Sequence, residues 1–548
     1  MSTNGPPFNP PVVCRDASLQ LEDGTVLMAR LWHPSSGGPW PALLMRQPYG
    51  RAIASTVTYA HPSWWAEHGF LVVVQDVRGM GDSSGQFRGF RQEATDGAAT
   101  QQWVRALPEC NGRLGCYGFS YQGLTQLLSS AESPPPDCLA PAMAGLNECE
   151  HWSCEGGAQW WHLGLGWGLQ LAALEARHRN DHQAWLKLRT SLESNAYLRD
   201  GPALLQRHAP DGMALQWLTS DPDRREEWTV HPVAAAVLRQ PMLLIGGCWD
   251  PHLNGILDLW RRARHAGGRP ELHIGPATHL QWWPEAQTLM LRFFQRHLQA
   301  PPEANRLNPA QIWNVTDATW QTLDPTTVDT AVPERRGPWA LRGNRVANMD
   351  NAIGGLEPGG AGQGMVTLVH DPWRPVPGIG GHLGVQPGPV DRQQLDGRSD
   401  VVTFTSQPLD EPCLLIGQPQ LKLGAWADQP GFDLCVALSR LPAGSTSVEQ
   451  LTTGTRRLRG ETCLHNRPRH IDLQAVCATF KPGDQLRLSI APAAWPAIGV
   501  NSGSPEVPCG APSHDHRVVT MTLDLADSAL TLNPFSSGRL DNDMIQLP

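Results

Sequence analysis

The chain has 548 residues, of which 41% are hydrophobic, and a formal net charge of −9 at pH 7. This length allows roughly two to four domains with sizeable cores. The acidic balance and the lack of any basic block exclude the charge pattern of a nucleic-acid-binding protein. The 54 glycines and 49 prolines indicate many turns and therefore a large β component.

Neither terminus nor interior predicts a membrane segment. The first 13 residues have no basic region followed by an apolar stretch, so we expect no signal peptide. The most apolar stretch, 161–174, is too short to span a bilayer, is rich in glycine and carries His162. We therefore expect a cytoplasmic protein with no membrane partner, and the sequence leaves a homo-oligomer open.

The twelve cysteines contain no C-x-x-C pair. Cys149, His151 and Cys154 are neighbours in the sequence, but their spacing fits no zinc motif. We favour buried free thiols over a metal site and expect no metal.

The first 125 residues alternate between predicted strands and helices. Apolar runs at 41–46, 70–79 and 112–118 predict strands, and 96–107 has helical spacing. After Ser120, one apolar helix face is predicted from residues at i, i+3, i+4 and i+7: Leu124, Leu127, Leu128 and Ala131. This alternation favours a mostly parallel sheet covered by helices.

The predicted organisation then changes twice. Residues 148–230 have helical periodicity and no good strand, which indicates an all-helical insertion. Strands at 240–250 and 271–280 and helices at 257–268 and 285–299 resume the β/α alternation.

From about residue 305 helical spacing nearly vanishes. Short strand-like runs follow, separated by Pro, Gly and Asp, at 400–409, 418–427, 432–441, 484–492 and 517–525. They predict an all-β sandwich or jelly roll. The glycine-rich stretch 351–364 is predicted to be a loop, because its G-A-G-Q-G does not lie between a strand and a helix as a dinucleotide site requires.

The sequence thus predicts a core built from two segments, with a helical cap inserted between them and a β domain at the end. The predicted bounds are 1–147 and 231–304 for the core, 148–230 for the cap and 305–548 for the β domain.

Three candidate catalytic residues follow predicted strands. Ser120, Asp250 and His279 each come just after a strand of the predicted parallel sheet, at the edge where such sheets bind ligands. Their order is that of the α/β-hydrolase triad. Ser120 would be the nucleophile, His279 its base, and Asp250 the group that orients and stabilises the imidazolium.

Each residue also has a simpler interpretation. "GFSYQG" departs from G-x-S-x-G because the glycine comes at 123, so Ser120 could be a small residue in a turn. Asp250 could cap a helix that starts at Pro251, and His279 could be one of many surface histidines. The agreement of all three with the topology favours the triad.

An oxyanion hole needs two donors aimed at the developing negative charge. The backbone N–H of Tyr121, directly after the nucleophile, is one candidate. The loop after the strand 41–46 has no Gly-Gly pair, but it offers the phenol of Tyr49. A packing tyrosine after a proline turn is the alternative.

These segments resemble the cocaine-esterase / X-Pro dipeptidyl-peptidase family of α/β-hydrolases, which includes α-amino acid ester hydrolases. The resemblance rests on "QPYGR" (47–51), "QDVRGMGDSSGQF" (75–87), "NGRLGCYGFSYQGLTQ" (111–126), "GGCWDPHLNG" (246–255) and "GPATHL" (275–280). Stretches of the β region agree as well: 370–381, 388–409, 432–441 and 486–496.

The resemblance implies an α/β-hydrolase core, an inserted helical cap and a C-terminal jelly roll. It implies the triad Ser120, Asp250 and His279, the oxyanion donors Tyr49 and Tyr121, and catalysis without a metal or organic cofactor. G-x-S-Y-x-G is the usual nucleophile segment of this family.

The sequence alone does not decide which residues line the substrate pocket. Candidate substrate-binding residues lie in and beside the predicted cap: Trp152, Trp160, Trp161, Trp167 and Glu150. The tryptophans could equally form the core of the cap. Glu150, with Glu148 and Glu155, could hold a substrate ammonium or could be solvated loop charges.

The leading hypothesis is a serine hydrolase that cleaves a small-molecule carboxylic ester or amide through an acyl-Ser120 intermediate, of carboxylesterase type. The alternatives are an X-Pro or aminoacyl peptidase, or an acyltransferase or cyclising enzyme with the same triad. A non-catalytic binding module is the third interpretation, and an intact triad argues against it.

Overall fold

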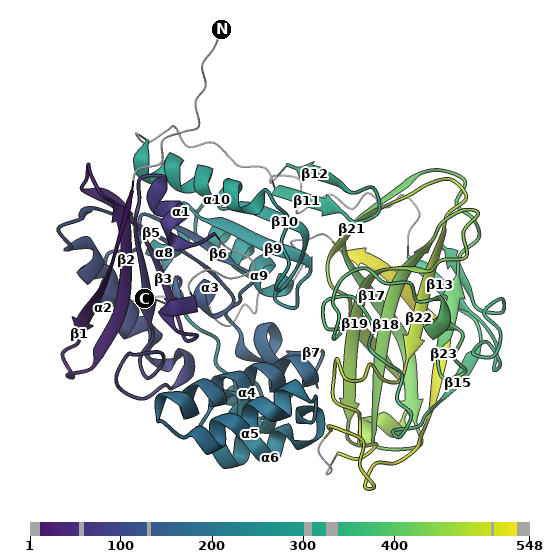
Figure 1. Cartoon of the computed structure of the whole chain (residues 1–548). Helices are drawn as coiled ribbons and strands as arrows, with labels where there is room; N and C mark the ends of the chain where they lie inside the picture. The colour runs from purple at the N-terminus through teal and green to yellow at the C-terminus, as the bar shows by residue number, and fades with distance from the viewer. Residues whose placement is uncertain are drawn as a thin grey trace. The chain divides into compact units, whose positions relative to one another are not determined.

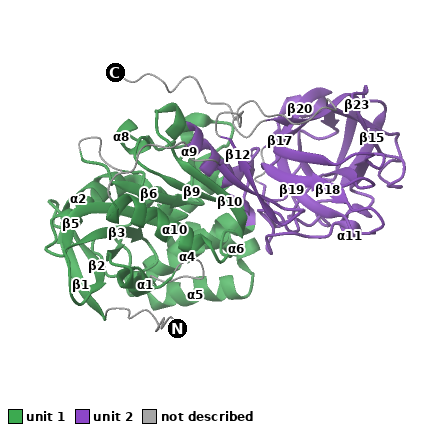
Figure 2. Ribbon diagram, turned by 90° about the horizontal axis from the view of Figure 1, so that it is seen from above, with its two compact units in different colours: residues 1–153, 162–247, 262–308 green, residues 154–161, 248–261, 309–548 purple. Residues whose placement is uncertain are grey.

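The computed structural model describes residues 11–53, 60–128, 133–300, 310–324, 338–505 and 509–533. These fall into two compact units (Figure 2). Unit 1 comprises residues 1–153, 162–247 and 262–308, and unit 2 comprises residues 154–161, 248–261 and 309–548.

A mostly parallel sheet forms the centre of unit 1 (Figure 1). Its strands are β1 (Val12–Gln20), β2 (Val26–Pro34), β3 (Trp40–Gln47), β4 (Leu71–Asp76), β5 (Cys110–Phe119), β6 (Cys138–Ala142), β9 (Leu243–Trp249) and β10 (Glu271–Thr278). They lie in the order β1-β2-β4-β3-β5-β6-β9-β10. From β4 through β3, β5 and β6 to β9 every pairing is parallel, whereas β1 and β2 add an antiparallel edge.

Helices cover both faces of the parallel part of this sheet, so strands such as β3 and β4 are buried on both sides. The helices are α1 (Pro62–Glu67), α2 (Glu93–Arg105), α3 (Tyr121–Thr125), α8 (Ala235–Leu238), α9 (Leu253–His265) and α10 (Ala286–Phe294), with helical turns η1 (Arg51–Ile53), η2 (Gly89–Gln92) and η5 (Gln295–Gln299). Leu43 and Met45 of β3 pack with α1 and α10, whereas Leu44 faces the cluster that contains Val104 of α2. The alternation follows from the strand period of two residues.

The strands and helices predicted for this core are all present, although several are shorter than predicted: β4 covers Leu71–Asp76 of the predicted 70–79, and β9 covers Leu243–Trp249 of the predicted 240–250. The helix after Ser120 is shorter than its apolar spacing predicted, and α3 ends at Thr125. Leu124, Leu127 and Leu128 are nevertheless buried, as their spacing predicted. Ala131 lies outside the described residues.

The segment predicted as a cap consists mainly of helices: α4 (Trp161–His178), α5 (His182–Glu193), α6 (Tyr197–His208), α7 (Met213–Thr219) and the turns η3 (Cys149–Ser153) and η4 (Arg225–Glu227). Asn180 and Asn195 follow α4 and α5 with positive φ angles of 60° and 58°, a conformation that asparagine tolerates better than most residues. The prediction that this segment is all-helical was wrong, because β7 (Cys154–Glu155) and β8 (Ala158–Gln159) form a small ribbon. Two-residue strands carry too little periodicity to be read from sequence.

Unit 2 is built mainly of strands. They are β11 (Ala310–Asn314), β12 (Thr319–Leu323), β13 (Trp339–Arg342), β14 (Gly355–Pro358), β15 (Met365–His370), β16 (Val402–Thr405), β17 (Cys413–Ala427), β18 (Gly431–Leu441), β19 (Glu449–Arg459), β20 (Arg467–Asp472), β21 (Val476–Phe480), β22 (Gln485–Ala491) and β23 (Val519–Asn533), with the short helices α11 (Gln393–Asp396) and η6 (Glu461–Leu464). Most pair in the order β19-β18-β22-β16-β14-β13-β23-β17-β20.

Alternating burial along the long strands forms the core of unit 2. In β17, Leu421, Leu423 and Ala425 are buried, and in β23 Met521 and Leu523 are buried, with intermediate residues between them. This is the pattern of a strand with one face toward an apolar core. The predicted combination of a mostly parallel α/β core with an all-β C-terminal domain is confirmed.

The glycine-rich stretch 351–364 is not only a loop, as predicted. β14 lies within it and pairs with β13, and Leu356 of β14 is 1% exposed. A single buried apolar residue among glycines is too weak a pattern to predict a strand.

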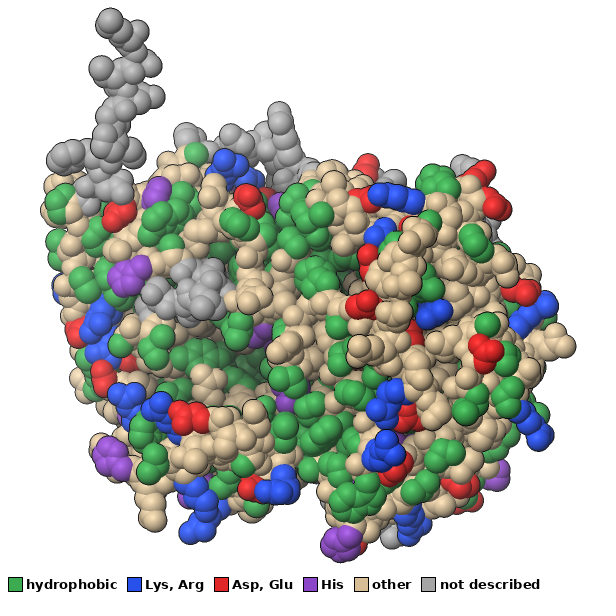
Figure 3. Space-filling view, turned by 45° about the vertical axis from the view of Figure 1, so that its right-hand side comes forward, with side chains coloured by type: hydrophobic (Ala, Val, Ile, Leu, Met, Phe, Trp, Pro, Cys, Tyr) green, Lys and Arg blue, Asp and Glu red, His purple; other side chains and the backbone are tan. Residues whose placement is uncertain are grey.

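Surface and cysteine chemistry agree with the composition. Figure 3 shows acidic and basic side chains interspersed over the face that it displays. Among the described residues, no helix combines the length and the apolar character needed to cross a membrane. All twelve cysteines lie among the described residues and are free thiols.

Candidate active site

Ser120 occupies a sharp turn between β5 and α3. Its φ and ψ angles are 59° and −128°, a strained backbone conformation for a residue with a side chain. The turn is held by hydrogen bonds from its N–H to the Ala142 carbonyl (3.0 Å) and to its own carbonyl from the Leu124 N–H (3.1 Å). This strand–turn–helix geometry is that of a nucleophile elbow.

Two glycines make the elbow possible. Gly118 has a φ of 143°, and a Cβ there would lie 2.4 Å from Cβ of Gln122. A Cβ on Gly123 would lie 2.7 Å from the carbonyl oxygen of Ala142, so only glycine lets α3 approach β6 this closely. The glycine at position 123 therefore has a packing role in this form of the motif.

Tyr49 follows β3, and its phenol reaches the nucleophile. Its oxygen accepts a hydrogen bond from Nε1 of Trp167 (3.1 Å), and its side chain also hydrogen-bonds to that of Ser120. Burial raises the pKa of Tyr49 to about 12, although both hydrogen bonds act in the opposite direction. The phenol therefore stays protonated at neutral pH and can donate a hydrogen bond.

Tyr121, the first residue of α3, is fully buried and held by its side chain. Its phenol donates toward Oε1 of Glu93 (2.8 Å) and lies 3.1 Å from the Gly89 carbonyl oxygen. Oε2 of Glu93 in turn accepts from Nη1 of Arg46 on β3 (2.5 Å). This network holds Tyr121 in place. Its backbone N–H is the predicted oxyanion donor, and the first N–H groups of a helix have no intrahelical acceptor, so this N–H can donate to a substrate oxygen.

His279 directly follows β10 and is partly exposed. Its ring lies 5.3 Å from the ring of Phe119, the residue that precedes Ser120. The structure therefore places this imidazole beside the elbow, as the strand topology predicted. A hydrogen bond between His279 and the Ser120 hydroxyl stays a prediction.

Asp250 directly follows β9 and is completely buried. Its carbonyl accepts a hydrogen bond from Nε2 of Gln474 (2.6 Å), and its Oδ1 lies 3.4 Å from the backbone nitrogen of His252. Helix α9 begins at Leu253 rather than at Pro251. Asp250 is therefore not the residue immediately before the helix, as the simpler interpretation required.

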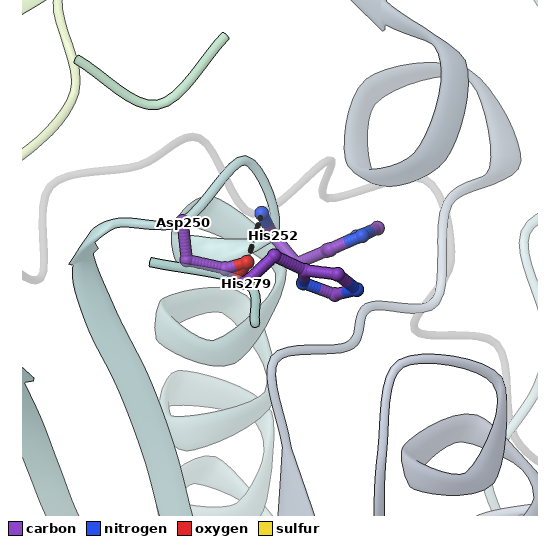
Figure 4. Close-up of side chains that lie close together, drawn as sticks. All are labelled: Asp250, His252 and His279. Carbon is purple, nitrogen blue, oxygen red and sulfur yellow. Dashed lines mark hydrogen bonds between the residues drawn. The ribbon is translucent and has the colours of Figure 1, made fainter. Parts of the chain in front are cut away.

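Asp250, His252 and His279 lie close together (Figure 4). One carboxylate oxygen and one nitrogen from each imidazole all lie within 4.8 Å of one another, a donor set that could hold a metal ion such as Zn²⁺. His252 is 5% exposed, and its ring meets that of Trp160 edge to face at 5.6 Å. Sequence reasoning missed His252, since one histidine near an aspartate carries no distinctive spacing.

The four candidate tryptophans separate into two pairs. Trp152 and Trp167 belong to unit 1, where their rings lie 6.1 Å apart and Trp152 also packs on Phe90 (5.1 Å). Trp160 and Trp161 belong to unit 2, where Trp161 packs on Trp495 at 6.3 Å. Of these four tryptophans, Trp167 is the one whose indole N–H donates to the phenol of Tyr49.

The candidate glutamates differ in their surroundings. Glu148 binds Nε1 of Trp217 through Oε2 (2.7 Å) and Nε2 of His231 through Oε1 (2.9 Å). Glu155 forms a short pair with His382. Glu150 is exposed on η3.

Several residues at the site escaped sequence analysis, namely Glu93, Trp217, His231 and His252. Their partners are distant in the chain, so no local spacing marks them.

Two family profiles match nearly the whole chain. Residues 23–281 match the X-Pro dipeptidyl-peptidase (S15 family), and residues 283–524 match the X-Pro dipeptidyl-peptidase C-terminal non-catalytic domain. Cocaine esterase from Rhodococcus sp. (strain MB1 Bresler) is 25% identical over 540 residues, covering 90% of this chain and 92% of that protein.

Solved structures show the same fold at lower identity. An aminopeptidase from a marine sediment archaeon, Thaumarchaeota archaeon, superposes with a TM-score of 0.70 at 19% identity, covering 97% of this chain and 98% of that one. An α-amino acid ester hydrolase gives 0.68 at 19% identity with 96% and 97% coverage. A CocE/NonD family hydrolase from Staphylococcus aureus gives 0.66 at 16% identity with 95% and 93% coverage. With the two profiles and the fold in agreement, the chain belongs to the X-Pro dipeptidyl-peptidase-like (CocE/NonD) family of hydrolases.

Proposed function

We propose that this protein is a serine hydrolase of carboxylesterase type that forms an acyl-enzyme on Ser120. The observation that carries the proposal is the strained elbow at Ser120, whose side chain bonds to the phenol of Tyr49. Backbone strain of this kind persists only where the surrounding structure enforces it, and it is concentrated at functional sites.

The proposed triad adds His279 and Asp250. His279 would accept the proton of the Ser120 hydroxyl as the oxygen attacks the substrate carbonyl carbon. Asp250 would accept a hydrogen bond from the other imidazole nitrogen and stabilise the imidazolium. The position of His279 beside Phe119 and its closeness to the buried Asp250 support these roles.

The oxyanion of the tetrahedral intermediate would accept hydrogen bonds from the Tyr49 hydroxyl and the Tyr121 backbone N–H. Collapse of the intermediate would expel the alcohol or amine, which takes the proton from the imidazolium. Water would then attack the acyl carbon of the acyl-Ser120 ester. The imidazole of His279 would accept the proton of the water and then give it to the departing Ser120 oxygen.

An ester substrate is favoured over a peptide with a free amino terminus. Such a peptide needs a carboxylate to hold its ammonium group. Both carboxylate oxygens of Glu148 already have partners in Trp217 and His231, and Glu155 is paired with His382. The third candidate, Glu150, is exposed on η3 rather than enclosed in a pocket. Cocaine esterase, a relative that aligns over nine tenths of this chain, is named for an ester substrate.

The decisive experiment combines labelling with substitution of Ser120. A fluorophosphonate should modify Ser120 in the native protein, as read by mass spectrometry of the labelled peptide. Ser120→Ala should lower kcat on activated aryl esters by about 10⁴-fold or more. An unlabelled Ser120, or full activity of Ser120→Ala, would refute the proposal.

Substrate class is tested by a panel of aryl esters, aminoacyl esters and X-Pro amides, compared by kcat/KM. The highest value is expected for simple esters. A preference for X-Pro amides would establish the peptidase alternative, and a product that carries an added amine or alcohol would establish acyl transfer.

A further inference from the structure

We propose that Trp167 is a positioning residue that aims the Tyr49 hydroxyl at the oxyanion. The inference rests on the proposed function and deepens it. It assigns to a residue of helix α4 a role that acts through Tyr49 rather than through contact with the substrate.

The argument starts from the donors and acceptors of the two groups. An indole Nε1–H can only donate, whereas a phenol has one proton and an oxygen that can accept. Since Trp167 donates to Oη of Tyr49 at 3.1 Å, the phenolic proton must point away from the indole. The other side-chain partner of this phenol is Ser120, so Oη lies at the nucleophile, and a proton turned away from the indole is available to the oxyanion that would form there.

The indole is itself held in place by neighbouring rings. Trp217 stacks on Trp167 at 5.7 Å with an interplanar angle of 24°, and Trp152 lies at 6.1 Å and 30°. Stacked contacts of this kind restrict rotation of the rings. The direction of the Trp167 N–H is therefore set by packing within unit 1.

A partly buried polar pair holds the outer ring of the stack, Trp217. Nε1 of Trp217 donates to Oε2 of Glu148 (2.7 Å), and Oε1 of Glu148 pairs with Nε2 of His231 (2.9 Å). A donor that bonds to a charged acceptor is held more strongly than one that bonds to a neutral one. One connected set of contacts thus runs from His231 through Glu148, Trp217 and Trp167 to Tyr49.

The same hydrogen bond improves the phenol as a donor. Burial raises the pKa of Tyr49, and the bond from Trp167 lowers it relative to burial alone. Donation into the phenol oxygen polarises its O–H bond, which strengthens the bond that the phenol donates.

Two other roles for Trp167 make different predictions. A wall of the acyl pocket would affect large acyl groups more than small ones and would change KM. A purely structural side chain would affect folding and leave the activity of each folded molecule unchanged.

The test is a double-substitution cycle on Trp167→Phe and Tyr49→Phe, measured with p-nitrophenyl acetate and p-nitrophenyl benzoate. Active-site titration counts the competent molecules. Trp167→Phe keeps an aromatic ring and removes the N–H, so kcat should fall about tenfold with KM within about twofold. Tyr49→Phe should lower kcat about 10²-fold, as loss of one oxyanion donor does.

The cycle separates the roles. If Trp167 acts through the Tyr49 hydroxyl, Trp167→Phe should have no further effect on Tyr49→Phe, and its effect should be equal for both esters. Three outcomes would each overturn the proposal. Trp167→Phe could lower kcat by the same factor in the native protein and in Tyr49→Phe, it could affect the benzoate ester more than the acetate, or it could leave kcat unchanged.

Trp228→Phe is the matched control, since the single N–H of the Trp228 indole donates to the Asp221 carbonyl and not to Tyr49. Its activity should equal that of the native protein. If Trp167→Phe does not fold, Trp217→Phe is used in its place and should give a smaller fall in kcat that again vanishes with Tyr49→Phe.

The two proposals can fail separately. Absence of labelling at Ser120 together with an active Ser120→Ala variant would refute the serine hydrolase. Labelling of Ser120 together with independent effects of Trp167→Phe and Tyr49→Phe would refute only the positioning role.

Discussion

Glu93 accepts a hydrogen bond from the phenol of Tyr121 at 2.8 Å while its second oxygen pairs with Arg46 at 2.5 Å. All three side chains are at least 97% buried. Arg46 lies on β3, Glu93 on α2 and Tyr121 on α3, so one carboxylate joins three elements around the elbow. A charge pair of this kind is costly to break, because the remaining partner stays buried and unpaired.

Glu93→Gln should therefore destabilise the protein by about 3 kcal/mol, since it leaves the Arg46 guanidinium buried without its counter-charge. The midpoint of urea unfolding checks this value. Glu193→Gln is the matched control, because Glu193 pairs with Arg189 at the surface, where such pairs contribute about 0.5 kcal/mol or less. Equal shifts for the two variants would contradict the role given to the buried pair.

Gly123→Ala should lower both stability and activity. The added Cβ would lie 2.7 Å from the Ala142 carbonyl oxygen and 2.9 Å from Cβ of Ala144, so α3 must move and carry Ser120 with it. A loss of about 1–3 kcal/mol is expected from such overpacking, with a fall in the rate of fluorophosphonate labelling.

Gly164→Ala provides the comparison for Gly123→Ala. Gly164 lies within α4, and nothing lies within 4 Å of a Cβ built there. The substitution should raise stability by up to about 1 kcal/mol through helix propensity. Both variants are measured by thermal unfolding. If Gly123→Ala leaves stability unchanged, α3 can shift without a loss of stability, which would contradict the prediction.

His273 on β10 should make stability depend on pH. Burial lowers its pKa from 6.5 to about 4, so the unfolded chain binds a proton in this range before the folded protein does. The stability that the neutral imidazole contributes is complete above pH 6.5 and is lost as the pH falls to about 4. The difference reaches about 3 kcal/mol, by linkage.

His273→Gln should flatten the dependence of Tm on pH between about 6.5 and 4, relative to the native protein. His514→Gln serves as the control, because the His514 side chain is 88% exposed. Parallel profiles for His273→Gln and the native protein would contradict the inference.

The side chains of Asp250, His252 and His279 could serve either a catalytic triad or a metal ion, but not both at once. In the proposed triad, Asp250 and His279 serve each other, so esterase activity should survive dialysis against a chelator such as EDTA, and His252→Gln should keep most of it. Activity that is lost with EDTA and restored by Zn²⁺ would assign the group to a metal instead. Metal content measured before and after dialysis accompanies the assay.

The candidate triad illustrates how far sequence reasoning reached. Buried parallel strands are continuous apolar runs, so the ends of β5, β9 and β10 could be located from sequence, and Ser120, Asp250 and His279 stand directly after them. The extent of α3 could not be predicted in this way. Its apolar face at Leu127 and Leu128 is buried, yet the helix ends at Thr125, and periodicity reports burial rather than hydrogen bonding.

The sequence by itself determined the α/β core, the all-β C-terminal domain and the residue types at the strand ends, because apolar periodicity and turn residues are local properties of the chain. Only the tertiary structure decided which distant side chains meet there. Trp167 donates to Tyr49 across 118 positions, and Glu93 meets Tyr121 across 28. Such contacts depend on how α4 and α2 pack beside the elbow, and no pattern within one segment encodes the packing of another.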